Sequence, residues 1–173
     1  MQAGEDRRKK ILSELTSSMR PINATKLAET YNVSRQIIVG DIALLRASGT
    51  DIYSTSRGYL LEKNRHKVGI IETIVSSHTP EETRKELEII VNNGGEILDV
   101  SVEHVLYGTL TGNLEIKNHE DIQNFFDTME REQAKSLSIL TDGIHSHRIF
   151  AKTDEALAKI LLELKKEDLL YHE

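Results

Sequence analysis

The sequence predicts an α+β protein of two domains, in which three helices and a hairpin precede an open-faced sandwich of strands and helices. Apolar residues recur at helical spacing through the first part of the chain, and β-prone runs then alternate with helical patterns. The charge is also uneven: residues 1–62 hold nine Lys and Arg against seven Asp and Glu, whereas residues 63–173 hold 13 against 21. An acidic body with a mildly basic head favours two domains, which we place at residues 1–62 and 66–173.

The composition excludes several classes of protein. The chain has 173 residues, of which 38% are hydrophobic and 29% charged, as is ordinary for a soluble folded protein. It lacks an apolar run of about 18 residues, so no transmembrane helix is expected, and its first residues do not follow the pattern of a secretory signal peptide. Because it has no cysteine, any metal must be bound by histidines and carboxylates. We therefore expect a cytoplasmic protein.

Three helices are expected in the first domain. The first is predicted by the apolar residues Ile11, Leu12 and Leu15. Asn23 can cap a second helix over residues 24–31, and Ser34 can cap a third that runs to about Ser48 before Gly49 ends it. The stripe of the third helix that we expect to be buried consists of Val33, Ile37, Ile38, Ile42 and Leu45.

The short turn between the second and third helices is typical of a helix-turn-helix. In this motif the first turn of the second helix of the pair enters the major groove, so Arg35 and Gln36 are expected to contact base edges. Arginine can bind guanine O6 and N7, and glutamine can bind adenine N6 and N7. Thr25, Lys26 and the hydroxyl of Ser34 are expected to contact phosphates, which position a protein without selecting a sequence.

A glycine, Gly40, interrupts the interior of the third helix. Glycine at such a position costs roughly 1 kcal/mol relative to alanine. We interpret it as allowing close approach of the helix backbone to DNA or to a neighbouring helix.

Two β-prone runs, at residues 51–54 and 58–61, flank the sequence Thr55-Ser56-Arg57-Gly58 and predict a hairpin. A hairpin after a helix-turn-helix is typical of a wing. Its tip residue, Arg57, would lie along a minor groove or a row of phosphates. The alternative is a small helical protein-interaction module with an ordinary hairpin.

The second domain is expected to follow the order β-α-β-β-α-β-α, with a mostly antiparallel sheet covered by helices on one face. The predicted strands cover residues 67–77, 96–102, 108–116 and 142–151, the third with a turn near residues 111–113. The predicted helices cover residues 80–93, 121–132 and a C-terminal segment that begins at Thr153 or Asp154. Thr79, Pro80 and Glu82 give the first of these helices a capping box.

Four residues of this domain form a candidate metal site. His145 and His147 are two apart on a predicted strand, so both imidazoles project from the same face. His78 precedes the predicted helix that carries Glu86. Together the four residues offer three imidazoles and a carboxylate, a set suitable for Zn, Ni, Fe or Mn. The alternative is that His145 and His147 lie on a solvent-exposed face of the strand and that His78 is a surface residue that caps the helix.

His104 and Tyr107 are candidates for contact with a small-molecule ligand. They follow a predicted strand, and we expect them to point into a pocket. The alternative for His104 is a buried, hydrogen-bonded histidine. The remaining histidines, His66, His119 and His172, are expected in a linker, a cap and a tail.

Two segments of the chain resemble known families. Residues 5–62, with Ile22–Ala28 and Val33–Ile42, resemble the winged-helix domain that begins biotin-repressor-like regulators. Residues 66–168 resemble the three-histidine (3H) domain. The matching motifs are Ser77-His78-Thr79-Pro80-Glu81 with Glu86, Val102-Glu103-His104 with Tyr107-Gly108, and Leu140-Thr141-Asp142-Gly143-Ile144-His145-Ser146-His147. The combination is similar to the NiaR-type niacin-responsive repressors of Gram-positive bacteria and their relatives.

The resemblance implies a repressor whose sensory domain has an HPr-like sandwich fold and binds a divalent metal through His78, Glu86, His145 and His147. It also implies nicotinic acid or nicotinamide as co-repressor of NAD-synthesis or niacin-uptake genes. A homodimer, formed through the second domain, would bind a double-stranded DNA operator, and the ligand would shift its population toward a DNA-competent state. One departure is Val105, where relatives often have proline.

Two other functions use the same residues. In a metal-responsive repressor, the ion itself would be the signal. In a metal-dependent hydrolase, the three histidines and the carboxylate would hold an ion that activates water. The chain lacks a glycine-rich phosphate loop and an activated-nucleophile motif, so an enzyme is not expected.

Overall fold

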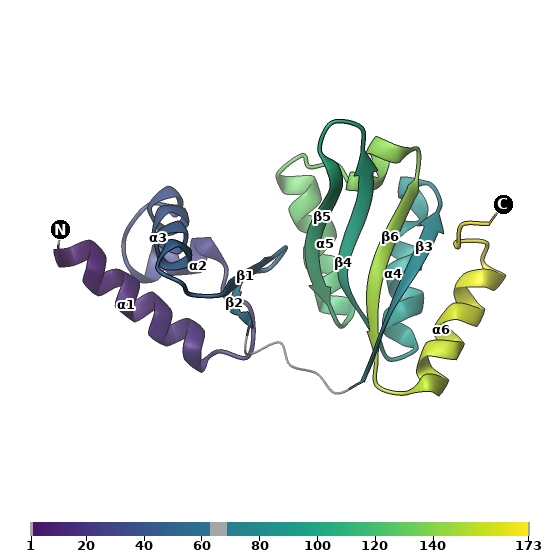
Figure 1. Ribbon diagram of the computed structural model, residues 1–173, viewed down its shortest axis with the longest axis horizontal. Coiled ribbons are helices and arrows are strands. Elements are labelled where there is room, and N and C mark those ends of the chain that lie inside the picture. Colours follow the sequence, from purple (N-terminus) through teal and green to yellow (C-terminus); the bar gives the residue numbers. More distant parts are fainter. Residues whose placement is uncertain (1, 63–68, 173) are drawn as a thin grey trace. The chain divides into compact units, whose positions relative to one another are not determined.

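The structure, a computed structural model, describes residues 2–62 and 69–172. The chain divides between residues 67 and 68 into two compact units, which we call the N-terminal and C-terminal units (Figure 1). His66 and Lys67, where the second domain and its first strand are predicted to begin, lie outside the described residues.

Within residues 2–62, the N-terminal unit contains three α-helices and a two-stranded sheet. They are α1 (Gln2–Ser17), α2 (Ala24–Thr30), α3 (Arg35–Ala47), β1 (Ile52–Thr55) and β2 (Gly58–Leu61). The predicted caps are confirmed, because the Asn23 side chain accepts the Lys26 N–H at 2.7 Å and the Ser34 hydroxyl accepts the Ile37 N–H at 3.3 Å. These caps fix where α2 and α3 begin, and therefore which side chains the first turn of α3 presents.

The buried stripe of α3 differs from the prediction at one residue. Ile38, Ile42 and Leu45 lie in the core of the unit, but Ile37 is 43% exposed. Successive helical residues are about 100° apart, so Ile37 cannot share the face that Ile38 occupies. The expectation that Ile37 is buried was wrong.

A carboxylate lies in the same buried stripe. Asp41 is only 3% exposed. It accepts hydrogen bonds from Arg7 Nε at 2.6 Å and from Arg8 Nη1 at 3.3 Å, both on α1. A buried charge is tolerated when it is paired and hydrogen-bonded, so this pair links α1 to α3 within the core.

The C-terminal unit confirms the predicted order of strands and helices. It contains β3 (Ile70–Ser77), α4 (Thr83–Asn92), β4 (Gly95–His104), β5 (Gly108–Ile116), α5 (His119–Arg131), β6 (Ile144–Ala151) and α6 (Asp154–Lys166). Two short 3₁₀ helices, η2 (Pro80–Glu82) and η3 (Leu137–Thr141), join them. The strands form one antiparallel sheet in the order β3-β6-β4-β5.

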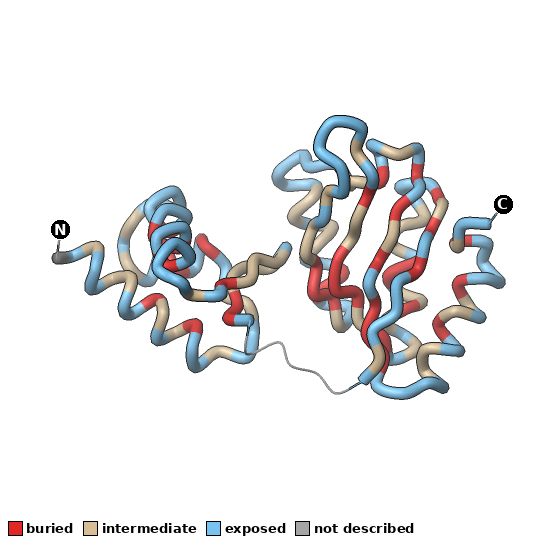
Figure 2. Tube along the Cα trace, viewed as in Figure 1, coloured by how far each residue is buried: buried red, intermediate tan, exposed pale blue. Residues whose placement is uncertain are grey.

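Helices α4, α5 and α6 cover one face of this sheet (Figure 1). Their apolar residues and those of the strands form a single core, and Figure 2 shows the buried residues running along the central strands. The fully enclosed members include Leu87, Ile90, Ile97, Ile116, Ile122, Ile149, Ile160 and Leu164.

Two predicted details of this unit need correction. Residues 111–113 do not form a turn, because Thr111 and Gly112 pair with Ser101 and Val100 inside a continuous β5. Pairing with β4 therefore overrides the local turn preference of Gly-Asn, and the chain reverses at residues 105–107 instead. The helix predicted from Pro80 begins as a 3₁₀ turn, although the capping box is present.

Candidate metal centre and nucleic-acid interface

Three histidines and a glutamate meet between the sheet and α4. His145 and His147 lie on β6 and share the inward face with the core residue Ile149. His78 directly follows β3, and Glu86 lies in the first turn of α4. The structure thus brings all four predicted metal ligands together, and we call His78, Glu86, His145 and His147 the His/Glu cluster.

One oxygen of Glu86 is the centre of the cluster. Its Oε2 atom lies 2.7 Å from Nε2 of His78 and 3.3 Å from Nε2 of both His145 and His147. The four residues are between 0% and 9% exposed. Ligand atoms of His78, Glu86 and His145 all lie within 4.8 Å of one another, so the cluster could hold a metal ion.

The other nitrogen of each ring fixes which atom faces Glu86. Every Nδ1 contacts a backbone carbonyl, which can only accept a hydrogen bond, so Nδ1 carries the proton and donates it. The pairs are His78 with Thr79 (2.9 Å), His145 with Gly143 (2.9 Å) and His147 with Asp99 (2.7 Å). In a neutral imidazole, Nε2 then presents a lone pair to the Glu86 carboxylate, and neither atom has a proton to donate to the other.

Four acceptors directed at one buried point need a cation between them, either protons or a metal ion. Histidine ligands of protein-bound metals commonly donate their second nitrogen to a carbonyl or carboxylate in this way. The donor set therefore fits a divalent metal that accepts imidazole and carboxylate ligands.

The pKa values of the cluster follow from the same contacts. Burial lowers the pKa of His78 and of His147, but the charge of Glu86 and its hydrogen bonds outweigh burial, so both pKa values are raised from the ordinary histidine value. Burial raises the pKa of Glu86, yet the nearby His147 charge and the three imidazole hydrogen bonds hold that pKa well below its usual value. Ser76 donates its hydroxyl to the second oxygen of Glu86.

An open depression of about 530 Å³ lies beside His78. Its lining residues are Ser77, His78, Thr79, Pro80, Glu82, Ser138, Ile139, Asp142 and Gly143. Pro80 and Ile139 give it apolar surface, whereas Glu82 and Asp142 are acidic. Sequence reasoning did not find this depression, because η3 was not predicted and the depression forms only where η3 meets the end of β3.

The structure places the two candidate ligand-binding residues elsewhere, at the turn between β4 and β5. The rings of His104 and Tyr107 stack with centroids 5.0 Å apart, and Tyr107 is 69% exposed. His104 Nδ1 accepts the backbone N–H groups of Leu106 and Tyr107 at 3.2 and 3.3 Å. The half-buried His104 side chain thus stabilises the turn. Neither His104 nor Tyr107 lines the depression beside His78.

The predicted DNA contacts lie at the beginnings of α2 and α3. The exposed members are Thr25, Lys26, Ser34, Arg35 and Gln36. Arg57 lies in the turn between β1 and β2 and is half-buried, and its backbone N–H donates to the Thr55 hydroxyl at 3.1 Å. For Gly40, apart from its chain neighbours and the adjacent backbone of α3, no atom among the described residues approaches within 4 Å of the position that a Cβ would take. Contact with a neighbouring helix therefore does not explain this glycine.

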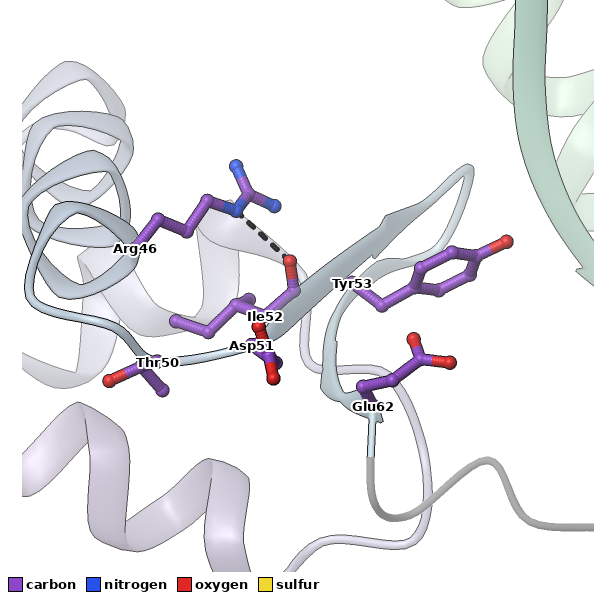
Figure 3. A pocket seen from close by; sticks show the side chains of 6 residues that line it. All are labelled: Arg46, Thr50, Asp51, Ile52, Tyr53 and Glu62. Carbon is purple, nitrogen blue, oxygen red and sulfur yellow. Dashed lines mark hydrogen bonds between the residues drawn. The ribbon is translucent and has the colours of Figure 1, made fainter.

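A hollow of about 360 Å³ lies between the end of α3 and β1 (Figure 3). Its lining residues are Arg46, Thr50, Asp51, Ile52, Tyr53 and Glu62. Arg46 Nε donates to the Ile52 carbonyl at 3.0 Å, and its Nη2 donates to the Ser54 hydroxyl. These bonds attach the hairpin to the C-terminal turn of α3, so the hollow marks a structural junction.

Comparisons with known proteins match both units. The 3H domain family matches residues 71–173, and the HTH domain family matches residues 7–60. The probable transcription repressor NiaR of Thermotoga maritima is 40% identical to this chain, over 98% of this chain and 95% of that protein. The transcription repressor NadR of Bacillus subtilis is 34% identical, over 96% of this chain and 94% of that protein. Among the described residues, no helix has the length and apolar character needed to cross a membrane.

Proposed function

The chain belongs to the family of the transcription repressors NiaR and NadR, and from that premise we propose that it represses genes of NAD synthesis or niacin uptake with nicotinic acid as co-repressor. The N-terminal unit would bind a double-stranded operator, and the C-terminal unit would bind a metal ion and the effector. The observation that carries the sensory role is the convergence of three imidazole nitrogens on Glu86 beside an open depression.

Operator binding would use the first turn of α3. Arg35 and Gln36 are exposed there, and the Ser34 cap fixes the turn that presents them. Thr25 and Lys26 at the beginning of α2, with Arg57 in the hairpin, would contact phosphates. Operator half-sites are usually bound by dimers, so the functional form would be a homodimer.

The metal would be held by Nε2 of the three histidines and by the carboxylate of Glu86. Zn, Ni, Fe and Mn all accept this donor set. When bound, the ion would supply positive charge and a Lewis-acidic contact for an electron-pair donor. The chain's own part is to hold each ring by its Nδ1 hydrogen bond and to exclude water, since the four side chains are almost fully enclosed.

The effector would occupy the depression beside His78. A pyridine ring is flat and apolar on its faces, which suits the surface of Pro80 and Ile139. The carboxylate or ring nitrogen of nicotinic acid is an electron-pair donor, and the depression reaches the His78 side of the cluster. His104 and Tyr107 remain a separate proposed contact, which a Tyr107→Ala variant would test.

A second function is favoured by the enclosure of the cluster. Because its four side chains are at most 9% exposed, a bound ion would be largely covered, and the ion alone could act as the signal. The chain would then be a metal-responsive repressor.

Operator affinity decides between these functions. The metal-loaded chain is titrated onto operator DNA with nicotinic acid, with nicotinamide, or with benzoic acid, which lacks the ring nitrogen. Tighter operator binding with nicotinic acid than with benzoic acid supports the niacin-responsive repressor. If none of the three compounds changes the affinity while chelation abolishes it, the metal-responsive function replaces the proposal.

A further inference from the structure

A bulge in β4 lies next to His147, one of the proposed metal ligands. Between β4 and β6, Ile97 pairs with Ile149 and Ser101 pairs with Ser146. Four residue steps along β4 therefore correspond to three along β6, so β4 carries one extra residue between these pairs. A β-bulge of this kind interrupts the ladder and aims a backbone or side-chain group in a new direction.

Asp99 lies within this bulge, and its backbone carbonyl points toward His147. It accepts the Nδ1 proton of His147 at 2.7 Å. The other two rings of the cluster are held locally: His78 bonds to the carbonyl one residue away, and His145 to the carbonyl two residues away. Asp99, by contrast, is 48 residues from His147 in sequence. The orientation of His147 therefore depends on tertiary structure, and specifically on the shape of β4 at this bulge.

The side chain of Asp99 holds the bulge against β6. It is only 1% exposed. Its Oδ1 accepts the backbone N–H of Arg148 at 3.2 Å, and its Oδ2 accepts Arg148 Nε at 2.6 Å and lies next to Nη2. Neighbouring residues of a strand point to opposite faces, so Arg148 binds this carboxylate from the face of the sheet opposite the one that carries His147.

We propose that Asp99, held by Arg148, is the positioning residue for His147 in the proposed metal site. The carboxylate fixes the bulge, and the carbonyl of the same residue fixes the ring of His147 with its proton on Nδ1. Nε2 is then unprotonated and directed at the ion. This inference rests on the proposed metal-binding function of the His/Glu cluster.

The test uses the full-length chain and three variants near the bulge. Asp99→Ala removes the carboxylate, Asp99→Asn keeps an oxygen that can accept the Arg148 N–H, and Arg148→Met removes the guanidinium. The control is Asp41→Asn, because Asp41 is also a buried carboxylate bound by arginines, but it lies in the N-terminal unit. Co²⁺ affinity is measured by competition with a chelator, and the imidazole ¹⁵N and N–H resonances are recorded by NMR on chelator-treated protein.

We expect Asp99→Ala to weaken Co²⁺ binding about 10–100-fold, the usual effect of losing a partner behind a metal ligand. The Asp99 carbonyl is still present in this variant, but without the carboxylate the bulge no longer holds it in line with His147. Asp99→Asn and Arg148→Met should weaken it less, and Asp41→Asn should not change it. In metal-free protein, the ring resonance of His147 should shift in the Asp99 and Arg148 variants, whereas those of His78 and His145 stay in place.

Wild-type Co²⁺ affinity and an unchanged His147 resonance in folded Asp99→Asn and Arg148→Met would overturn the proposal, whether or not Asp99→Ala folds. Equal shifts of all three histidine resonances would also overturn it, because they would mean that Asp99 supports the unit as a whole. If the wild-type chain itself fails to bind Co²⁺, the proposed metal function fails, but the NMR comparison still tests the link from Asp99 to His147.

Discussion

Gly143 passes so close to His78 that a Cβ added to Gly143 would lie 2.4 Å from the His78 carbonyl oxygen. Gly143 also has a φ of 93°, and its carbonyl accepts the Nδ1 proton of His145 at 2.9 Å. Gly143 thus packs against the backbone of one proposed metal ligand, His78, and orients the ring of another, His145.

Gly143→Ala should therefore damage both stability and metal binding. A left-handed φ costs a non-glycine residue about 1–2 kcal/mol, and the steric overlap adds about 1–3 kcal/mol. We expect the free energy of unfolding to fall by at least about 2 kcal/mol in urea titrations, with a parallel loss of Co²⁺ affinity. Gly94→Ala is the matched control: its φ is also positive, at 81°, but among the described residues other than its chain neighbours no atom lies within 4 Å of its Cβ position. If the two variants lose equal stability and both keep metal, the close approach to His78 has no role.

The stability of the metal-free chain should depend on pH in a definite direction. The pKa values of His78 and His147 are raised above 6.5 in the folded chain, so their stabilising contribution is complete below about pH 6.5 and is lost as pH rises through the folded values. The pKa of Glu86 is lowered from 4.5, so its contribution is present above about pH 4.5 and is lost as pH falls through its folded value. Stability should therefore be greatest between these limits.

Urea unfolding of chelator-treated chain at pH 5.5 and pH 8 checks this expectation, with lower stability at pH 8. Glu86→Gln should flatten the difference, because it removes the carboxylate that raises both histidine pKa values. The metal-loaded chain should show the opposite trend, since imidazoles must be neutral to bind a metal. A metal-free wild-type chain that becomes more stable from pH 5.5 to pH 8 would contradict the assigned ionisation of the cluster.

Features set by local spacing could be predicted from the sequence. The two-residue spacing of His145 and His147 placed both rings on one face, and the capping chemistry at Asn23 and Ser34 located the beginnings of α2 and α3. Glu82 and Glu86 follow His78 at successive steps of four residues, about one helical turn each, and this spacing placed Glu86 near His78 in the candidate site. Each of these predictions uses a strand or helix period, or a cap, over a few residues.

Features that depend on distant pairing could not be predicted. Residues 111–113 have the composition of a turn, but β4 holds them extended. The stripe over α3 could not show that Asp41 is buried, since its partners Arg7 and Arg8 lie on another helix. In the same way, nothing near His147 in the sequence indicates that its ring is held by Asp99.

The first turn of α3 supplies a prediction about sequence selection. Arg35→Ala should lower the affinity for the operator by about 1–3 kcal/mol and relax selection at one base position, as expected for loss of a bidentate contact to guanine. Lys26→Ala should instead weaken binding to operator and random DNA alike and reduce the salt dependence, because it would remove a phosphate contact. Electrophoretic or fluorescence titrations on both DNAs at several salt concentrations separate the two. Equal losses by Arg35→Ala on both DNAs would remove Arg35 from base contact.

Gly40 allows a test in which stability and DNA binding should move in opposite directions. Apart from its chain neighbours and the adjacent backbone of α3, no atom among the described residues lies within 4 Å of its Cβ position, so alanine meets no steric obstacle from the rest of the described N-terminal unit. Alanine in a helix interior is favoured over glycine by about 0.5–1 kcal/mol, so Gly40→Ala should raise the free energy of unfolding by that amount.

The same methyl group would stand on the exposed side of α3, the helix expected to enter the major groove. If close approach of DNA is the reason for glycine at this position, Gly40→Ala should weaken operator binding while it stabilises the fold. Gly4→Ala in α1 is the control, since Gly4 is also a helical glycine with only flexible arginine side chains near its Cβ position. It should leave operator affinity unchanged. A stabilised Gly40→Ala variant with wild-type operator affinity would exclude close approach of DNA as the reason for glycine at this position, because the added methyl group would then not disturb the bound DNA.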